Sequence, residues 1–278
     1  VSALAGHLKL DNFVLIYDAN RVSLDGPLAE SSSEDTKLRY QAYGWDVLEI
    51  DGNDLDAIHE AFSFIRENQT KPYLVIARTL IGKGAPNKAG THKVHGAPLG
   101  KEEVAAAKDA LGISQDDFFV PQPVLNYFHQ CKQQGRQLED AWNQQYHAWA
   151  KTHSELAKTL ETMLHKTLPP ELETELRALS IKAPISGRKA SQEVLQFLAQ
   201  KLPGLYGGSA DLSCSDMTML QKFSIVSPGH YEGRNIKYGV REFGMAGMAT
   251  GLAETGFILP YIGTFLTFSD YMRNAIRL

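Results

Sequence analysis

Cysteine is scarce in this chain, since only Cys131 and Cys214 occur among its 278 residues. Two cysteines cannot build the disulfide framework of a small secreted scaffold, and the sequence contains no cysteine or histidine group with the spacing of a zinc site. We therefore expect a reducing compartment, the cytoplasm, as the location of the protein.

An excess of charge of one sign and long hydrophobic runs are also lacking. The 28 Lys and Arg residues against 32 Asp and Glu residues give a net charge of -4, which offers no attraction to nucleic acid or to an anionic membrane. No apolar run reaches the length of about 18 residues that spans a bilayer, and the first residues do not resemble a signal peptide. No Gly-x-Gly-x-x-Gly follows a predicted strand, which argues against a nicotinamide-dependent dehydrogenase. We therefore expect no nucleic-acid partner and no membrane association.

The first part of the chain has the pattern of an α/β fold. With 43% apolar and 22% charged residues, the composition is that of a globular protein whose length favours two domains. Near-continuous apolar runs over residues 12–18 and 72–78 predict strands that are buried on both faces. An amphipathic helix is predicted between them over residues 54–66, so a parallel strand-helix-strand unit is expected, followed by a helix over residues 101–111.

A different composition begins near residue 121. Residues 121–184 are rich in Gln, carry Trp142, Tyr146 and Trp149 at helical spacing and contain Pro169-Pro170, which indicates a mostly helical connector whose aromatic side chains dock on other parts of the protein. The α/β pattern then resumes, with predicted helices over 191–202 and 244–254, a short predicted strand with a turn over 205–212, and predicted strands over 236–240 and 257–264. We therefore predict domains over residues 1–120 and 189–278, joined by a connector over residues 121–188.

Both ends of the chain read as interrupted. The sequence opens on VSALAGHLKL without an initiator Met, and it stops at YMRNAIRL in helical register without a Gly or Pro stop signal. We expect the chain to be a piece of a longer protein.

The segment GKGAPNKAGTHKVHGAPLG, residues 82–100, follows a predicted buried strand and contains no Asp or Glu. Glycines let backbone amides approach a ligand, and ligands of open parallel sheets gather beyond the carboxyl ends of the strands. We therefore expect this segment to bind a phosphate. The alternative is that it is a mobile surface loop. His92 and His95 could bind a metal, but the sequence offers no third ligand nearby, which argues against a metal site. The basic side chains of the segment are Lys83, Lys88, Lys93, His92 and His95.

Two further turns could bind anions. In SGRKAS, residues 186–191, Arg188 and Lys189 stand at a predicted helix start, where a phosphate is stabilised but cations alone are not. Solvated side chains at a frayed helix end explain them equally well. GGSADLSCS, residues 207–215, offers hydroxyl groups and Asp211, which is a weaker signal.

The stretch KYGVREFGMAGMATGLAETGF, residues 237–257, places Glu242 where a helix begins. Gly244, Gly247 and Gly251 form a small-residue face, which would allow another backbone to approach closely. A carboxylate at this position could have a catalytic role. Two explanations without a catalytic role are also open: Glu242 stabilises the helix through its dipole, or it forms an ion pair with Arg241.

Six segments of the sequence, taken in order, resemble the transketolases, a family of thiamine-diphosphate enzymes. They are YDANRVSLDG (17–26), KAGTHKVHGAPLG (88–100), GRKASQ (187–192), GGSADL (207–212), YGVREFGM (238–245) and GTFLTFSDYMRNAIR (263–277). The resemblance is weakest over residues 121–184. It implies an α/β fold with two parallel-sheet halves of the thiamine-diphosphate-binding type, joined by the helical connector.

The resemblance also implies an activity. Transketolases transfer a two-carbon ketol (glycolaldehyde) unit from a ketose phosphate to an aldose phosphate in the pentose phosphate pathway. They use thiamine diphosphate together with Mg²⁺ or another divalent cation such as Ca²⁺. The implied assembly is a homodimer with its active site at the subunit interface, and the implied partners are sugar phosphates.

By the same resemblance, Glu242 is the catalytic glutamate. Its carboxyl group would hydrogen-bond the far pyrimidine nitrogen of the cofactor and drive the imino tautomer that removes the thiazolium proton. Partial desolvation beside the apolar helix would raise its pKa and assist this exchange. His95, with His92 beside it, matches the histidine near the diphosphate and the reacting substrate.

Other roles carry over by position. Asn20 matches the metal-binding asparagine, and the backbone carbonyl of Val22 would be a further oxygen ligand. Leu24 resembles the residue that wedges the cofactor into its bent shape, and Ile81 one that packs on its rings. Without the resemblance both would count as core residues.

Aromatic and polar residues complete the implied site. Phe265, Phe268 and Tyr271 resemble the pocket for the aminopyrimidine, although residues at a spacing of three could equally line a core. Arg188 and Ser215 match groups that bind the sugar phosphate. Asp211 matches a cofactor-binding residue near the active centre.

Parts of the family pattern are missing from this chain, among them the Gly-Asp-Gly segment with the other side-chain metal ligand. We therefore expect the isolated 278-residue chain to be inactive. A related thiamine enzyme, such as a dihydroxyacetone synthase or a deoxyxylulose-phosphate synthase, remains an alternative. A non-catalytic piece that serves dimerisation or phosphate binding is another.

Overall fold

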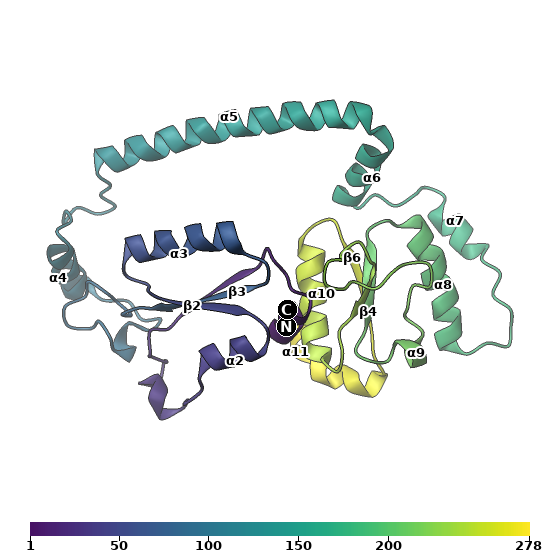
Figure 1. Ribbon diagram of the computed structural model, residues 1–278, viewed down its shortest axis with the longest axis horizontal. Helices are drawn as coiled ribbons and strands as arrows, with labels where there is room; N and C mark the ends of the chain where they lie inside the picture. Colours follow the sequence, from purple (N-terminus) through teal and green to yellow (C-terminus); the bar gives the residue numbers. More distant parts are fainter. The chain divides into compact units, whose positions relative to one another are not determined.

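The computed structural model describes all residues from 1 to 278. They form two compact units, residues 2–139 and residues 140–278, with Val1 belonging to the second. Each unit contains one three-stranded, all-parallel sheet with helices packed against it (Figure 1). The expected α/β fold with two parallel-sheet halves is confirmed.

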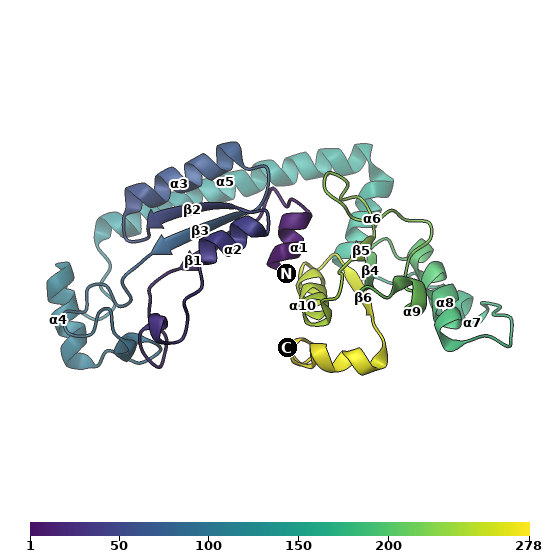
Figure 2. The same cartoon turned by 60° about the horizontal axis from the view of Figure 1, so that its bottom comes forward.

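The first unit holds the strands β1 (Val14–Asp18), β2 (Asp46–Asp51) and β3 (Tyr73–Arg78) in the order β1-β3-β2. Because all three strands are parallel, their carboxyl ends meet at one edge of the sheet (Figure 2). The helices of this unit are α1 (Ser2–His7), η1 (Leu28–Glu30), α2 (Thr36–Ala42), α3 (Leu55–Asn68), η2 (His92–Val94) and α4 (Lys101–Leu111).

Helices cover both faces of this sheet. On one face, Ile65 of α3 packs with Tyr73 and Val75. On the other face, Ala5 of α1 and Trp45 pack with Leu74 and Ile76 of β3. The central strand β3 is therefore buried on both sides, as predicted for residues 72–78.

Two features of this sheet differ from the sequence-based expectation. Strand β1 is not buried on both faces, because it lies at the edge of the sheet and Ile16 is 57% exposed. Strand β2 was not predicted, although it pairs along its whole length with β3, from Asp46 opposite Tyr73 to Asp51 opposite Arg78.

The second unit holds β4 (Leu205–Ser209), β5 (Asn235–Lys237) and β6 (Leu259–Gly263) in the order β5-β4-β6. Helix α8 packs on one face of this sheet and α10 on the other (Figure 1). The three predicted strands are found, and β5 and β6 are shorter than predicted. The helices are α6 (Ser154–Leu164), α7 (Leu172–Arg177), α8 (Gly187–Lys201), α9 (Ser213–Asp216), α10 (Glu242–Glu254), η3 (Leu266–Met272) and α11 (Arg273–Arg277).

The central strand β4 needs its glycines. A Cβ atom on Gly207 would lie 1.8 Å from the carbonyl oxygen of Tyr261, and one on Gly208 would lie 2.0 Å from that of Ile236. Neither neighbour can move away, because both oxygens belong to the backbone of paired strands. Only glycine therefore fits at these two positions.

Helix α5 (Gln122–Thr152) passes through the boundary between the two units and buries none of its residues. Its aromatic side chains stack on one another: the ring centroids of Trp142 and Tyr146 lie 5.3 Å apart, and those of Trp149 and His153 lie 5.6 Å apart. The expectation of a mostly helical connector is met, but Trp142 does not dock, since it is 61% exposed.

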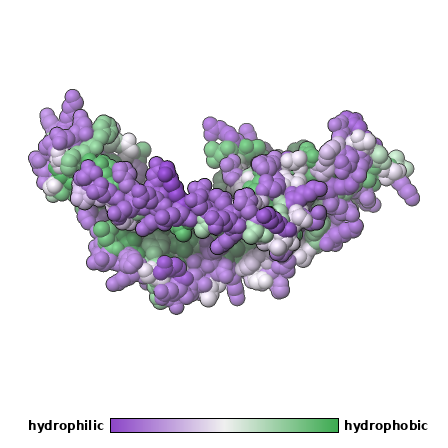
Figure 3. All heavy atoms as spheres, turned by 90° about the horizontal axis from the view of Figure 1, so that it is seen from above, coloured by the Kyte–Doolittle hydropathy of each residue, from purple (hydrophilic) through white to green (hydrophobic).

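None of the helices combines the length and the apolar character that a membrane span requires. The face of the molecule in Figure 3 is covered mostly by hydrophilic side chains, with smaller hydrophobic patches between them.

Candidate active site

A cavity of about 780 Å³ opens at the carboxyl edge of the first sheet. Its walls come from residues within segments 19–27, 51–53, 78–80 and 90–92, which follow β1, β2 and β3 and include part of the glycine-rich loop. This is the edge of a parallel sheet at which ligands gather. Among the charged side chains that line it, Arg21 and Arg78 outnumber Asp51, so the cavity favours an anion.

The predicted metal ligands Asn20 and Val22 both line this cavity. The side-chain oxygen Oδ1 of Asn20 accepts a hydrogen bond of 3.0 Å from the amide of Val22, which fixes its orientation. The carbonyl oxygen of Val22 accepts no hydrogen bond within the chain. Ser23 closes the turn, because its amide and its hydroxyl donate to the carbonyl of Gly26 over 2.8 and 3.1 Å.

These two oxygens suit a hard cation such as Mg²⁺, which prefers amide and carbonyl ligands. The chain holds no group of three or more His, Cys, Asp or Glu residues that could bind a metal by itself. The residues present therefore fit as part of a ligand set, to be completed by a bound phosphate and by groups from elsewhere.

The predicted cofactor contacts Leu24 and Ile81 lie near the cavity but do not line it. Leu24 belongs to the turn after Asn20 and is 70% exposed, so it is not a core residue. Ile81 follows β3 closely, and its carbonyl accepts a 2.8 Å hydrogen bond from the amide of Gly90. This bond ties the glycine-rich loop to the end of the central strand.

The glycine-rich loop is anchored by Glu103, which lies in the first turn of α4 and is buried. Its carboxylate accepts hydrogen bonds from the backbone amide and from the side-chain amide of Asn87, over 2.8 and 2.9 Å. These bonds, the one from the Asn87 side chain first, hold the pKa of the Glu103 carboxyl below its usual value. Lys88 adds a 2.6 Å hydrogen bond to the carbonyl of Leu99. The loop therefore has a defined conformation.

The two histidines of this loop occupy different positions. His92 is exposed and lines the cavity, together with Thr91. His95 ends η2 and is half-buried. Its amide donates to the carbonyl of His92 over 3.0 Å, and its side chain is not part of the cavity wall.

Glu242 is the first residue of α10 in the second unit and is half-buried. It is not paired with Arg241, whose guanidinium donates to the carbonyl of Tyr238 over 2.9 Å. Tyr238 is completely buried, and this burial raises the pKa of its phenol to about 12. The ion-pair alternative for Glu242 is thereby ruled out, and the favourable position at the helix start remains.

The small-residue face of α10 makes no close contact along most of its length. A Cβ atom on Gly247 or Gly251 would meet no atom within 4 Å. The close backbone approach that the sequence suggested is therefore not made within the second unit at these two positions.

Phe265, Phe268 and Tyr271 form a ladder of rings at η3. Successive ring centroids lie 6.1 and 6.4 Å apart with nearly parallel planes, because a 3₁₀-helix brings residues three apart onto the same side. Tyr271 is 68% exposed, so the rings do not line a core. Helix η3 packs against α10, which begins with Glu242.

Arg188 and Ser215, the predicted phosphate ligands, are brought together. The guanidinium of Arg188, in the first turn of α8, donates to the carbonyl of Ser215 in α9 over 3.3 Å. Asp211 lies in the turn before α9, is exposed and has a φ of 63°.

Two polar residues beside this group were not predicted from the sequence. Asp216 accepts hydrogen bonds from the hydroxyl of Ser209 and from the amide and the hydroxyl of Thr218. Lys237 donates to the hydroxyl of Ser213 over 2.6 Å. The Asp-x-Thr spacing is typical of a side-chain-capped turn and was the available signal for Asp216, whereas Lys237 comes close only through strand pairing.

Comparison with known proteins identifies the family. Residues 1–169 match the family described as "Transketolase, thiamine diphosphate binding domain", and residues 183–278 match "Transketolase, pyrimidine binding domain". A transketolase from Geobacillus stearothermophilus is 42% identical over 280 residues, and transketolase 2 of Escherichia coli is 41% identical over 286 residues. Both alignments cover 100% of this chain but 42% of the relative.

Solved structures agree with these relatives. The fold is similar to that of a transketolase from Leishmania mexicana, with a TM-score of 0.94 and 33% identity, over 99% of this chain and 42% of the other. A transketolase from Campylobacter jejuni gives a TM-score of 0.87 and 36% identity over the same shares of the two chains. The chain therefore belongs to the transketolase family.

Proposed function

We propose that this chain contributes to a transketolase active site that transfers a two-carbon ketol unit from a ketose phosphate to an aldose phosphate, in the pentose phosphate pathway. The observation that carries the proposal is the cavity at the carboxyl edge of the first sheet, in which the oxygens of Asn20 and Val22 lie among cationic side chains. The chain spans 42% of the length of the Geobacillus and Escherichia relatives, so the activity belongs to a longer protein.

Sugar phosphates are the proposed substrates. Solved structures of a transketolase from Pichia stipitis, 33% identical to this chain, are complexes with fructose-6-phosphate and with sedoheptulose-7-phosphate. In this chain the adjacent Arg188 and Ser215 would bind the phosphate group, because a guanidinium forms charge-assisted hydrogen bonds to its oxygens.

The proposed cofactors are thiamine diphosphate and Mg²⁺ or a similar divalent cation. When bound, thiamine diphosphate supplies a carbon acid whose conjugate base holds the two-carbon fragment. Asn20 and Val22 would hold the metal through their side-chain and backbone oxygens. Leu24 and Ile81 would provide apolar contacts to the ring portion, and the exposure of Leu24 supports this role.

In the second unit, the carboxyl group of Glu242 would hydrogen-bond a pyrimidine nitrogen and exchange a proton with it. Phe265, Phe268 and Tyr271 would offer a flat apolar wall to the same ring, which their nearly parallel planes and the exposure of Phe265 and Tyr271 support. Asp211 would lie near the cofactor. His95 would act near the diphosphate and the reacting carbon once a ligand orders its side chain toward them.

The proposed assembly is a homodimer with the active site at the subunit interface. The uncovered face around Gly247 and Gly251 supports it, since this face leaves room for a closely packed backbone. Both cysteines are free thiols, which supports a cytoplasmic location. We also propose the domain limits 1–120, 121–188 and 189–278, and inactivity of the chain alone.

The test is ketol transfer by the full-length protein that contains this chain, with thiamine diphosphate, Mg²⁺, xylulose 5-phosphate as donor and ribose 5-phosphate as acceptor. We expect sedoheptulose 7-phosphate as the product, and no turnover by the 278-residue chain alone. Formaldehyde as acceptor, and pyruvate as donor, separate the two related synthase activities. Efficient use of either in place of the sugar phosphates would contradict the proposal.

A further inference from the structure

Arg78 stands between two cavities of the first unit. It is the last residue of the central strand β3, and it lines both the cavity of about 780 Å³ and an adjoining one of about 430 Å³. The adjoining cavity is polar and also includes Glu34, Lys37 and Glu49. A cation at this boundary can act in either space.

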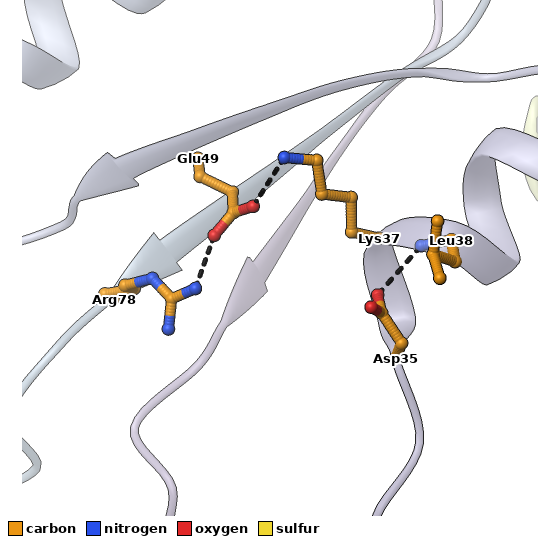
Figure 4. A network of polar contacts seen from close by, with 5 residues as sticks. All are labelled: Asp35, Lys37, Leu38, Glu49 and Arg78. Carbon is orange, nitrogen blue, oxygen red and sulfur yellow. Dashed lines mark hydrogen bonds and ion pairs between the residues drawn. The ribbon is translucent and has the colours of Figure 1, made fainter.

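In this structure Arg78 is paired with Glu49 of β2, and Lys37 of α2 is paired with the same carboxylate (Figure 4). The Lys37 ammonium lies 2.9 Å from Oε1 of Glu49, while the guanidinium of Arg78 contacts Oε2. One terminal nitrogen of Arg78 faces Glu49 and the other points away from it (Figure 4). Two cations thus share one carboxylate, and the group carries one uncompensated positive charge.

The pairing of Arg78 is easily exchanged. Its side chain is 53% exposed, and exposed ion pairs contribute little to stability. If Arg78 leaves, Glu49 is still neutralised by Lys37, so no unpaired carboxylate remains. The hydrogen bonds from Lys37, and then from Arg78, hold the pKa of the Glu49 carboxyl below its usual value, so the carboxylate is ionised at neutral pH.

We propose that Arg78 is a further diphosphate-binding residue, which exchanges its contact with Glu49 for a phosphate oxygen in the larger cavity while Lys37 keeps Glu49 paired. A guanidinium suits this role because it matches phosphate geometry with two parallel donors. The assignment rests on the proposed function, since it takes the diphosphate as the guest of the cavity. The sequence motifs did not indicate Arg78. In this proposal Glu49 competes with the phosphate for the Arg78 guanidinium.

The experiment measures binding of inorganic pyrophosphate with Mg²⁺ to the full-length protein that contains this chain, by calorimetry, without thiamine and without turnover. Arg78→Met should weaken the affinity about tenfold, because a charge-assisted contact is lost. Glu49→Gln should strengthen it roughly threefold, because Arg78 is released from an exposed ion pair. Thermal unfolding of each variant checks that the fold is kept.

The double variant separates an exchange from a general charge effect. If Glu49 acts through Arg78, then Glu49→Gln changes nothing in the Arg78→Met background. Glu34→Gln removes the same charge from the adjoining cavity, where Glu34 pairs with Arg39, and should leave the affinity unchanged. Unaltered affinity in Arg78→Met, or tighter binding by Glu49→Gln that persists without Arg78, overturns the assignment. An unmodified full-length protein that binds no pyrophosphate overturns the proposed diphosphate site itself.

Discussion

The two parallel sheets of this chain have the same number of strands but differ in the segments at their carboxyl ends. After the strands of the first sheet come a tight turn with Asn20 and a long glycine-rich loop, which surround a cavity of about 780 Å³ with cations and hard oxygens. After those of the second sheet come a short helix, a helix that begins with Glu242 and a ladder of rings. The first set suits a charged, hydrated group and the second a flat ring.

The centres of the two sheets differ as well. Strand β3 fills its surroundings with large apolar side chains such as Leu74 and Val75, which are completely buried. Strand β4 instead uses Gly207 and Gly208, over which the neighbouring backbones pass. One architecture can therefore be stabilised by side-chain packing or by close backbone contact, while the chemistry depends on the connections between the strands and helices.

The largest effect is expected from Glu242→Gln, which tests whether proton exchange belongs to the second unit alone. The amide cannot exchange a proton, so ketol transfer by the full-length protein should fall by about 10³-fold. Binding of pyrophosphate and Mg²⁺, assigned to the first unit, should be unchanged. Glu254→Gln, at the opposite end of α10, is the matched control and should keep the full rate. Undiminished ketol transfer by Glu242→Gln would contradict the assignment of proton exchange to Glu242.

The contrast between the sheet centres is tested by Gly207→Ala. Its Cβ would collide with the carbonyl of Tyr261 at 1.8 Å, so the free energy of unfolding should drop by about 3 kcal/mol or more. Denaturant titration followed by circular dichroism measures it. Gly251→Ala adds the same methyl group where it meets no atom, and should stabilise α10 by roughly 0.5–1 kcal/mol. Equal effects of the two substitutions would contradict the packing described for β4.

Asn20→Ala tests whether the first unit supplies metal ligands. Loss of the Oδ1 oxygen should weaken the Mg²⁺-dependent binding of pyrophosphate roughly tenfold, measured by Mg²⁺ titration in a calorimeter. The control is Asn12→Ala, an exposed asparagine ahead of β1. If Asn20→Ala binds Mg²⁺ with unchanged affinity, Asn20 is not a metal ligand.

A smaller effect, on pH dependence, is expected from Glu103→Gln. The pKa of Glu103 is lower in the folded chain than in the unfolded one, so its contribution to stability is present above the unfolded pKa of about 4.3 and is lost as the pH falls through the folded pKa. Glu103→Gln should therefore lower the melting temperature at pH 7 more than at pH 3. Melting curves of Glu102→Gln, the exposed neighbour in the same helical turn, should show a smaller difference between the two pH values.

Much of this fold could be predicted from the sequence because its periodic segments are strong. Helix α4 coincides with the predicted range 101–111, and the apolar run at β3 is buried on both faces. Strand β2 escaped prediction because half of its six residues are acidic, and Glu49 and Asp51 break up the apolar run. The exposure of Ile16 could not be foreseen, since the order of strands in a sheet is a tertiary property.

The candidate site was predictable to the extent that it consists of motifs. Asn20 and Val22 line one cavity, and Arg188 contacts Ser215, as neighbours in a site should. Three further polar residues carry no strong local signal, because each meets its partners through strand register or through a turn that forms only in the folded chain. They are Arg78, Asp216 and Lys237.

The hydrogen bonds within the loop from Gly82 to Gly100 have a consequence for its motion. The amides of Asn87, Gly90 and His95 all donate to acceptors inside the first unit, so they should exchange with deuterium more slowly than those of a free glycine-rich segment. An anion that arrives at this loop meets a surface that is already ordered. Little chain entropy is then lost on association, and the rate of capture is set by diffusion and charge.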